Sequence, residues 1–248
     1  MNPWVATPAA IAAIAGVAAY GAVWPRAQLF GATICRTNSP RQLAITFDDG
    51  PNPAITPKLL DLLDRYNARA TFFVIGGFAR ECPDLVREIA SRGHVVGNHT
   101  ETHPALVFLR PTDIQVELRL CHSAITNTLG APPRWFRPPF GVRNPWLASA
   151  VRALDMRVVM WTLIPGDWRA ASAEWLIGRM KPIAANAERL AKNSVGSGDI
   201  LCLHDGSHRA QNADRTRTLA ALEHWLPRWR DLGLEFVTIN DAVRAPAS

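Results

Sequence analysis

Short apolar runs alternate with amphipathic stretches from residue 42 onward. Most of these runs lack a polar alternation, as expected for strands that are covered by helices on both faces. They predict seven strands, at residues 43–47, 71–74, 94–97, 135–137, 157–161, 200–203 and 235–239. Strands that alternate with helices in this way predict a parallel sheet built from βα units.

The amphipathic stretches carry recognisable start and stop signals. Thr56 followed by Pro57 predicts an N-cap and the first helical position. A longer helix is expected over 114–125 with its end at Gly130, and another covers 219–229. At 248 residues the chain suits one α/β domain, and either a closed barrel or an open doubly wound sheet fits the pattern.

The first 25 residues carry no charged side chain, and residues 5–23 are mostly Ala, Ile, Val and Gly. Because this run just reaches the length of a membrane-spanning helix, we expect membrane association through residues 4–24. A signal peptide would require Lys or Arg before the run, and none occurs there. By the positive-inside rule, the arginines that follow the run would place the remainder of the chain in the cytoplasm. The orientation is therefore open. The predicted division is a signal or anchor segment (1–26), a linker (27–41), a catalytic domain (42–242) and a tail (243–248).

A net charge of +6 and a pI near 9.7 favour anionic polymers or membrane surfaces. No basic run with interleaved aromatics occurs, which argues against nucleic-acid binding. No glycine-rich phosphate loop or G-x-S-x-G follows a predicted strand, which argues against a nucleotide enzyme and a serine hydrolase. Cys35, Cys82, Cys121 and Cys202 lack metal-site spacing, so we interpret them as free thiols and Cys202 as a small buried hydrophobe.

Polar side chains gather where the predicted strands end. Asp48 and Asp49 follow the first strand, and Gly50-Pro51 turns the chain immediately afterwards. The other strand ends carry His99, Arg137, Asp167 and His204. Both candidate folds place their sites at the carboxyl ends of parallel strands, so these groups are expected to meet at one edge.

His99 and His103 lie four residues apart in the segment GNHTETHP. On a helical turn this spacing puts both imidazoles on one face. With a strand-end aspartate they form a 2-His-1-carboxylate set, which leaves metal positions open and can lower the pKa of a bound water to about 7. Neighbouring residues leaving a strand point to different sides, so one of Asp48 and Asp49 can bind the ion while the other accepts a proton.

The motifs TFDDGP, GNHTETHP, RPPFG, GDW and ILCLHDG occur in the order found in polysaccharide deacetylases of the NodB-homology type, carbohydrate esterase family four, which the chain resembles over roughly residues 41–240. The resemblance implies a single-domain α/β fold, a deformed (β/α)7 barrel. It also implies an enzyme of the cell envelope that removes N-acetyl groups from an amino-sugar glycan by attack of metal-bound water on the acetamide carbonyl. Peptidoglycan, chitin-type oligomers and lipid-linked glycans are the expected substrates, and the oligomeric state is open.

The resemblance also implies residue roles at the metal. Asp48 would be the catalytic base, kept ionised by Arg137. Asp49, His99 and His103 would bind a divalent ion, with Zn2+ expected first and Co2+, Ni2+ or Mn2+ as alternatives.

On the substrate side, the resemblance implies that His204 protonates the departing amine. The main-chain N–H of Phe140 would stabilise the oxyanion, although the family often has tyrosine at this position. His208 is interpreted as a loop histidine that could touch substrate. The expected substrate and oxyanion group consists of Phe140, Pro139, Trp168, Asp167 and Leu203.

One position departs from the family pattern. The fourth motif usually reads Asp-x-x-Asp-Trp, and its first aspartate orients the catalytic histidine, whereas this chain has Ile164 there. We therefore expect His204 to be a weaker acid unless another carboxylate substitutes, and Asp205 is too close in sequence to assume that it turns back. Two alternatives remain: hydrolysis of another ester or amide (O-acetyl xylan, a cyclic imide) on the same site, or a sugar-binding pseudoenzyme weakened by Ile164.

Overall fold

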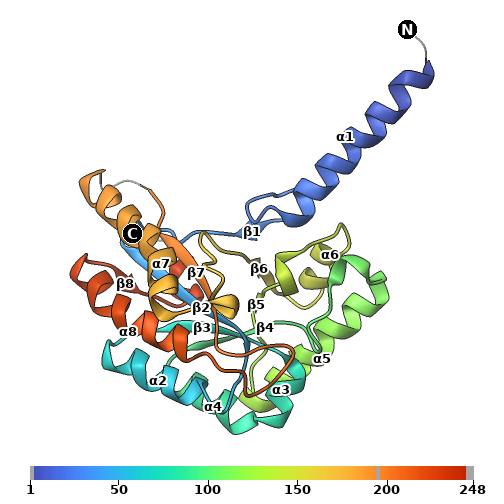
Figure 1. Ribbon diagram of the computed structural model, residues 1–248. Helices are drawn as coiled ribbons and strands as arrows, with labels where there is room; N and C mark the ends of the chain where they lie inside the picture. The colour runs from blue at the N-terminus through green and yellow to red at the C-terminus, as the bar shows by residue number, and fades with distance from the viewer. Residues whose placement is uncertain (1–2, 194–195, 244–248) are drawn as a thin grey trace, which may run out of the picture.

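The structure, a computed structural model, describes residues 3–193 and 196–243 (Figure 1). Its strands are β1 (Thr33–Ile34), β2 (Gln42–Gly50), β3 (Ala70–Val74), β4 (Val95–Asn98), β5 (Trp135–Phe136), β6 (Arg157–Val159), β7 (Asp199–His204) and β8 (Glu235–Phe236). Its α-helices are α1 (Pro3–Val23), α2 (Thr56–Arg65), α3 (Gly76–Glu81), α4 (Pro83–Ser91), α5 (Pro111–Leu129), α6 (Leu147–Arg152), α7 (Ala173–Asn193), α8 (Thr216–Asp231) and α9 (Ile239–Ala242).

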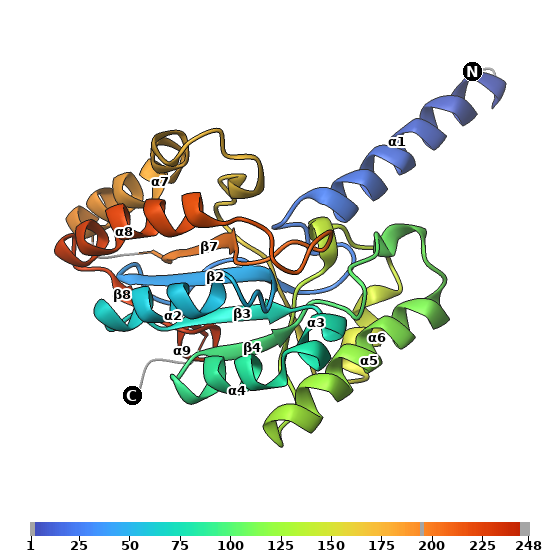
Figure 2. The same ribbon diagram turned by 60° about the horizontal axis from the view of Figure 1, so that its bottom comes forward.

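All strand pairs in the sheet are parallel, in the order β1-β6-β5-β4-β3-β2-β7, and β8 also pairs with β2. Two isolated bridges, Leu163 with Leu201 and Arg36 with Asp199, join the β1–β6 end of the sheet to β7. The sheet therefore curls back on itself, and helices surround it (Figure 2). This arrangement confirms the expected deformed barrel in one domain.

The predicted strands exist, but their ends and number differ. Predicted strands 135–137 and 157–161 shorten to β5 and β6. The strand predicted over 235–239 was wrong beyond Phe236. There the Thr238 side chain accepts a hydrogen bond from the Asp241 N–H and begins α9. β1 was not predicted, since two paired residues leave no periodicity to read. The segment 27–41 thus contributes a strand to the sheet, and the domain limits themselves stay a prediction.

The helix signals were right at Gly130 and wrong at Thr56. Gly130 takes a left-handed φ of 73° at the end of α5. Thr56 lies inside α2, and Ile55 is the N-cap. The Thr56 hydroxyl donates instead to Asp205 Oδ2 at 2.5 Å and accepts the Asn52 N–H at 2.9 Å. It therefore ties the turn after β2 to the segment after β7.

Burial on both sides of β2 explains why its sequence lacks polar alternation. Every residue of β2 after Gln42 is buried, including Phe47, which stacks on Phe72 of β3 with ring centroids 5.0 Å apart. Each buried Leu, Ile or Phe side chain of this kind contributes about 1.5–3 kcal/mol on burial. This core fixes the carboxyl ends of β2 and its neighbours, where the polar groups emerge.

Helix α1 extends away from the body of the molecule (Figure 1). Its end is held by Arg143, which is 1% exposed and donates to the carbonyls of Trp24 and Ala27, while its main-chain N–H donates to Ala22. No helix in the described part of the chain reaches the length and apolarity that a membrane crossing requires.

Candidate active site

A cavity of about 600 Å³ opens at the carboxyl ends of the strands. Its floor carries carboxylates and imidazoles, and its sides come from the segments after β5, β6 and β7. The lining residues are Asp48, Asp49, His99, His103, Pro138, Phe140, Gly141, Trp161, Ile164, Trp168, His204, Ser207, His208, Arg209 and Arg215. The polar strand ends predicted from the sequence therefore do meet at one edge of the sheet.

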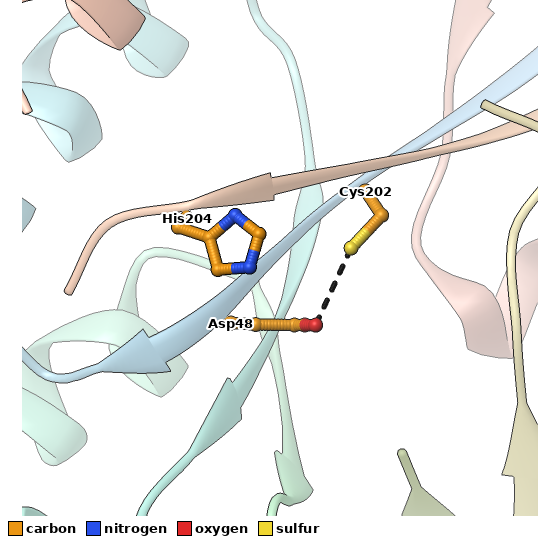
Figure 3. Close-up of side chains that lie close together, drawn as sticks. All are labelled: Asp48, Cys202 and His204. Carbon is orange, nitrogen blue, oxygen red and sulfur yellow. Dashed lines mark hydrogen bonds between the residues drawn. The ribbon is translucent and has the colours of Figure 1, made fainter. Parts of the chain in front are cut away.

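Asp48 is buried against one cation and one thiol. Arg137 Nη1 donates to its Oδ1 at 2.8 Å, and Cys202 Sγ donates to its Oδ2 at 3.3 Å (Figure 3). His204, from the end of β7, lies beside the same carboxylate (Figure 3). Asp48 therefore has a cationic partner on one oxygen and a thiol on the other.

Arg137 is fully buried and each part of its guanidinium has a partner. Besides Asp48 it donates to Thr46 Oγ1 at 2.7 Å and to the carbonyls of Val159 and Met160 at 3.2 and 3.1 Å. It also lies over the Phe73 ring at 4.3 Å. This fixed fork joins β2, β5 and the end of β6, so the position of Asp48 is set by the barrel rather than by a loop.

Asp49 points away from Arg137 and toward two imidazoles. Its Oδ1 lies 3.1 Å from His103 Nε2 and 3.4 Å from His99 Nε2. Burial opposes ionisation, but contacts with His103, His208 and His99 outweigh it and hold the Asp49 pKa well below its usual range. The two adjacent aspartates thus leave β2 in different directions, as their position in the chain predicted.

The Asp49, His99 and His103 side chains fit a divalent ion. All three are buried, their candidate ligand atoms lie within 4.8 Å of one another, and Asp49 Oδ1 has no hydrogen bond among the described residues. Ligand atoms around a tetrahedral zinc ion lie about 3.3–3.5 Å apart, close to the two distances above. His99 Nδ1 contacts the Arg137 carbonyl at 2.7 Å, which orients its Nε2 toward the site.

The spacing of the two histidines would suit a helical turn, but in the structure they do not lie on one. The segment from His99 to His103 is a loop in which Thr100 and His103 take left-handed φ values of 67° and 60°. Glu117 of α5 holds this loop by accepting the main-chain N–H groups of Glu101 and Thr102 at 3.0 and 2.9 Å. The spacing in the sequence identified His99 and His103 as a pair, but the geometry of their loop depends on the distant Glu117 carboxylate.

His208 is a site residue that the sequence interpretation placed only loosely. Its ring stacks on His103 with centroids 4.4 Å apart, and its Nδ1 lies 3.7 Å from Asp49 Oδ2. Phe140, from the segment after β5, contacts the His103 ring edge-on with ring centroids 4.7 Å apart. Since buried His103 Nδ1 has no hydrogen bond among the described residues, these ring contacts hold the imidazole.

Asp167 orients His204, so the missing aspartate at position 164 has a substitute. Its Oδ1 lies 2.8 Å from His204 Nδ1, and its Oδ2 accepts the His204 main-chain N–H at 2.8 Å and the Thr218 hydroxyl at 3.1 Å. Burial alone would lower the His204 pKa, but the Asp167 charge and hydrogen bond raise it to about 9. Of the two outcomes expected from Ile164, the structure therefore has the second, in which another carboxylate substitutes for the missing aspartate. Asp205 instead bonds Thr56.

The expected substrate group divides into two sets. Phe140 and Trp168 line the cavity and are 56% and 47% exposed, and Trp168 contacts the His204 ring edge-on at 4.9 Å. Asp167, Pro139 and Leu203 are buried and are not among the described residues that line it. Asp167 faces His204, and Leu203 belongs to the core, because alternate residues of β7 point to opposite faces.

Cys202 is a buried free thiol, as interpreted from the sequence, and it also has a polar contact with Asp48 that the sequence did not indicate. It lies two residues before His204 on β7, so both side chains face the same side, a signal that alternation alone could have provided. Asp48, Cys202 and His204 are close enough to suggest a second metal site. Burial and the Asp48 charge, however, raise the Cys202 pKa well above its ordinary value. In this structure the thiol is a hydrogen-bond donor to Asp48.

Together these features define a barrel hydrolase with a candidate Asp-His-His metal site, a carboxylate paired with arginine and a carboxylate-oriented histidine. The family profile described as polysaccharide deacetylase matches residues 36–159. The chain belongs to the polysaccharide deacetylase family, and the family expected from its motifs is confirmed.

Individual relatives agree with this assignment. The chain is 35% identical over 208 residues to a peptidoglycan-N-acetylglucosamine deacetylase of Bacillus cereus, covering 84% of this chain and 90% of that protein. It is 34% identical to a chitooligosaccharide deacetylase of Azorhizobium caulinodans, covering 77% and 89%. A crystal structure of a peptidoglycan N-acetylglucosamine deacetylase superposes with a TM-score of 0.71 at 27% identity, covering 85% and 92%.

Proposed function

We propose that this protein is a metal-dependent deacetylase that hydrolyses the N-acetyl groups of an amino-sugar glycan of the cell envelope. The observation that carries the proposal is the division of labour between adjacent carboxylates: Asp48 pairs with Arg137, and Asp49 faces His99 and His103. Relatives that act on peptidoglycan and on chitooligosaccharides support the choice of an N-acetylated glycan.

The metal group would consist of Asp49, His99 and His103, with His208 and Phe140 against the outer imidazole. A divalent ion in this group supplies Lewis acidity that activates water and polarises an acetamide carbonyl. Imidazole and carboxylate ligands suit zinc first, and cobalt, nickel and manganese are the alternatives.

Proton transfer falls to two groups on the cavity floor. Asp48, positioned by Arg137, accepts the proton of the attacking water. His204, with its pKa raised to about 9, is protonated at neutral pH and donates to the nitrogen of the departing amine. An amide needs this donation, because an amide anion is a poor leaving group. Phe140 and Trp168 flank the floor, and the main-chain N–H of Phe140 is the proposed oxyanion donor.

The function is tested with the full chain. We expect about one equivalent of bound divalent metal, and acetate release from N-acetylated chitooligosaccharides or peptidoglycan that stops on chelation and returns with Zn2+. Acetate release that resists chelation would contradict the metal mechanism. Bound metal with release only from O-acetylated xylan would favour the esterase alternative, and bound metal with no turnover on any of these would favour the sugar-binding alternative.

We also propose that α1 associates with a lipid surface. The support is its composition and exposure: no charged residue occurs before Arg26, and Ile11, Ile14, Val17 and Tyr20 are each more than half exposed. Exposed apolar side chains on every side of a helix favour transfer into an apolar medium. Such an attachment fits an enzyme of envelope glycans.

The test is co-sedimentation with vesicles of phosphatidylcholine and phosphatidylglycerol. We expect the full chain to pellet with vesicles, and a variant lacking residues 2–17 to stay in solution. The deletion keeps Ala22, Trp24 and Ala27, whose carbonyls bind Arg143, so that the body of the protein is undisturbed. Concentration-dependent self-association without vesicle binding would assign the helix to contacts between copies instead.

A further inference from the structure

The cavity has one cationic side. The residues contributed by the segments after β5 and β6 are mainly aromatic or apolar, namely Phe140, Trp161, Ile164 and Trp168. The segment between β7 and α8 contributes Ser207, His208, Arg209 and Arg215 instead. Two guanidinium groups therefore border a cavity in which Asp48 and Asp49 are the only carboxylates among the described lining residues.

Those two carboxylates are already engaged. Asp48 bonds buried Arg137, and Asp49 lies within 3.1–3.4 Å of two imidazoles in the proposed metal group. Neither has an unpaired charge to offer Arg209 or Arg215. Ile164 also lines the cavity, so the segment after β6 adds no negative charge there.

Arg209 and Arg215 form no ion pair with a carboxylate in the described part of the chain, whereas eight other arginines do. Arg215 Nε donates to the Gly206 carbonyl at 2.9 Å, and its Nη1 contacts the Asp214 carbonyl at 3.3 Å. These main-chain contacts fix the guanidinium, and the exposed Asp214 carboxylate beside it interacts with it electrostatically but forms no ion pair with it among the described residues. The main-chain N–H of Arg209 is held by Ser207 Oγ at 3.3 Å, and its side chain is exposed.

We infer that the cavity selects a glycan that carries an anionic group, a carboxylate or a phosphate, near the N-acetyl sugar that reacts, and that Arg209 and Arg215 bind this group. The inference rests on the proposed deacetylase function and narrows its substrate class. Arginine binds both oxyanions through paired N–H donors, whereas an uncharged chitin oligomer offers these side chains only hydroxyl and amide groups. Specificity of this kind improves substrate binding rather than the chemical step, so we expect it to lower KM for the anionic substrate and to leave kcat unchanged.

The test compares two tetrasaccharides that differ mainly in charge. One alternates N-acetylglucosamine with N-acetylmuramic acid, whose lactyl carboxylates are free, and the other is N-acetylchitotetraose, which lacks the lactyl ethers. We expect the wild-type chain to prefer the anionic substrate by about tenfold in kcat/KM, with the advantage shrinking as salt is raised. N-acetylchitotetraose carrying a reducing-end phosphate separates the two sources of charge, since a preference for it alone would assign the site to phosphate.

Variants locate the preference. Arg209→Gln combined with Arg215→Gln should lower the ratio of the two kcat/KM values about tenfold, mainly through KM, and Arg215→Lys should keep part of it. Arg217→Gln is the matched control, because Arg217 lies directly after the segment that carries both arginines, in the first turn of α8, donates to the Ala170 carbonyl and does not line the cavity. Its ratio should match that of the wild type.

The outcomes separate this inference from the proposed function. Equal kcat/KM for charged and neutral substrates, or an equal loss on both in the double variant, would overturn the anionic preference while leaving a deacetylase. Release of acetate from none of the three glycans, with metal bound, would contradict the deacetylase function itself.

Discussion

Asp48→Asn is expected to lower kcat for acetate release by about 10³-fold while the metal stays bound. Asparagine keeps the shape of the side chain and an oxygen that can accept from Arg137 Nη1, now 2.8 Å from Asp48 Oδ1. It cannot accept a proton from water. The measurements are kcat at saturating substrate and the metal content of the purified variant.

Asp49→Ala provides the opposite result and Asp205→Asn the matched control. Removing Asp49 leaves His99 and His103 without the carboxylate between them, so metal and activity should be lost together. Asp205 is a buried aspartate at the end of β7 whose pKa burial raises to about 7, and it does not line the cavity. Its amide variant should remain close to wild type in kcat. An Asp48→Asn enzyme within tenfold of wild type would exclude Asp48 as the base.

The sequence predicted the parts of the site that depend on strand ends. Asp48, Asp49 and His204 occupy the carboxyl ends of buried strands, and parallel strands bring these ends to one edge. The apolar runs that define β2 and β7 are buried almost completely, so their pattern is easy to recognise. Five motifs in order then identified the family.

What the sequence could not predict depends on loops and on contacts between distant segments. The left-handed φ values at Asp49, His103 and Phe140, 70°, 60° and 56°, occur at residues other than glycine. Such conformations persist only where the surrounding structure imposes them. For His103 that support includes the Thr100 hydroxyl, which accepts its main-chain N–H at 3.0 Å. No local pattern announces it.

Arg143 shows the same limit. In the sequence it is one scattered arginine after the RPPFG motif, and in the structure it is a buried cation held by main-chain carbonyls at the end of α1. Burial lowers its pKa, because no carboxylate among the described residues forms an ion pair with it. The negative end of the α1 dipole and fixed carbonyls replace a counter-ion, an arrangement that only tertiary structure reveals.

Asp167→Asn is expected to reduce kcat by about 10²-fold or more at pH 8 and to move the alkaline limb of the pH–rate profile downward. His204 acts in its protonated form, so activity is lost as pH rises through the His204 pKa. Asp167 raises that pKa to about 9 against the effect of burial. With a neutral amide in its place the main raising effect is lost and only the Asp49 and Asp48 charges still oppose burial, so the pKa falls below about 9 and less of the acid is protonated at pH 8. The measurement is kcat from pH 5 to 10.

Two further variants test whether the charge of Asp167, or only its contact with His204, raises the His204 pKa. Thr218→Val removes one hydrogen bond to Asp167 Oδ2 but keeps the carboxylate, so its alkaline limb should stay near 9. Ile164→Asp alone should bring no gain, because Asp167 already holds His204 at 2.8 Å. In the Asp167→Asn background the same change should restore part of the activity and move the limb upward, since it returns a carboxylate to the position that the family usually uses. An unchanged limb in Asp167→Asn would mean that a group other than His204 protonates the leaving amine.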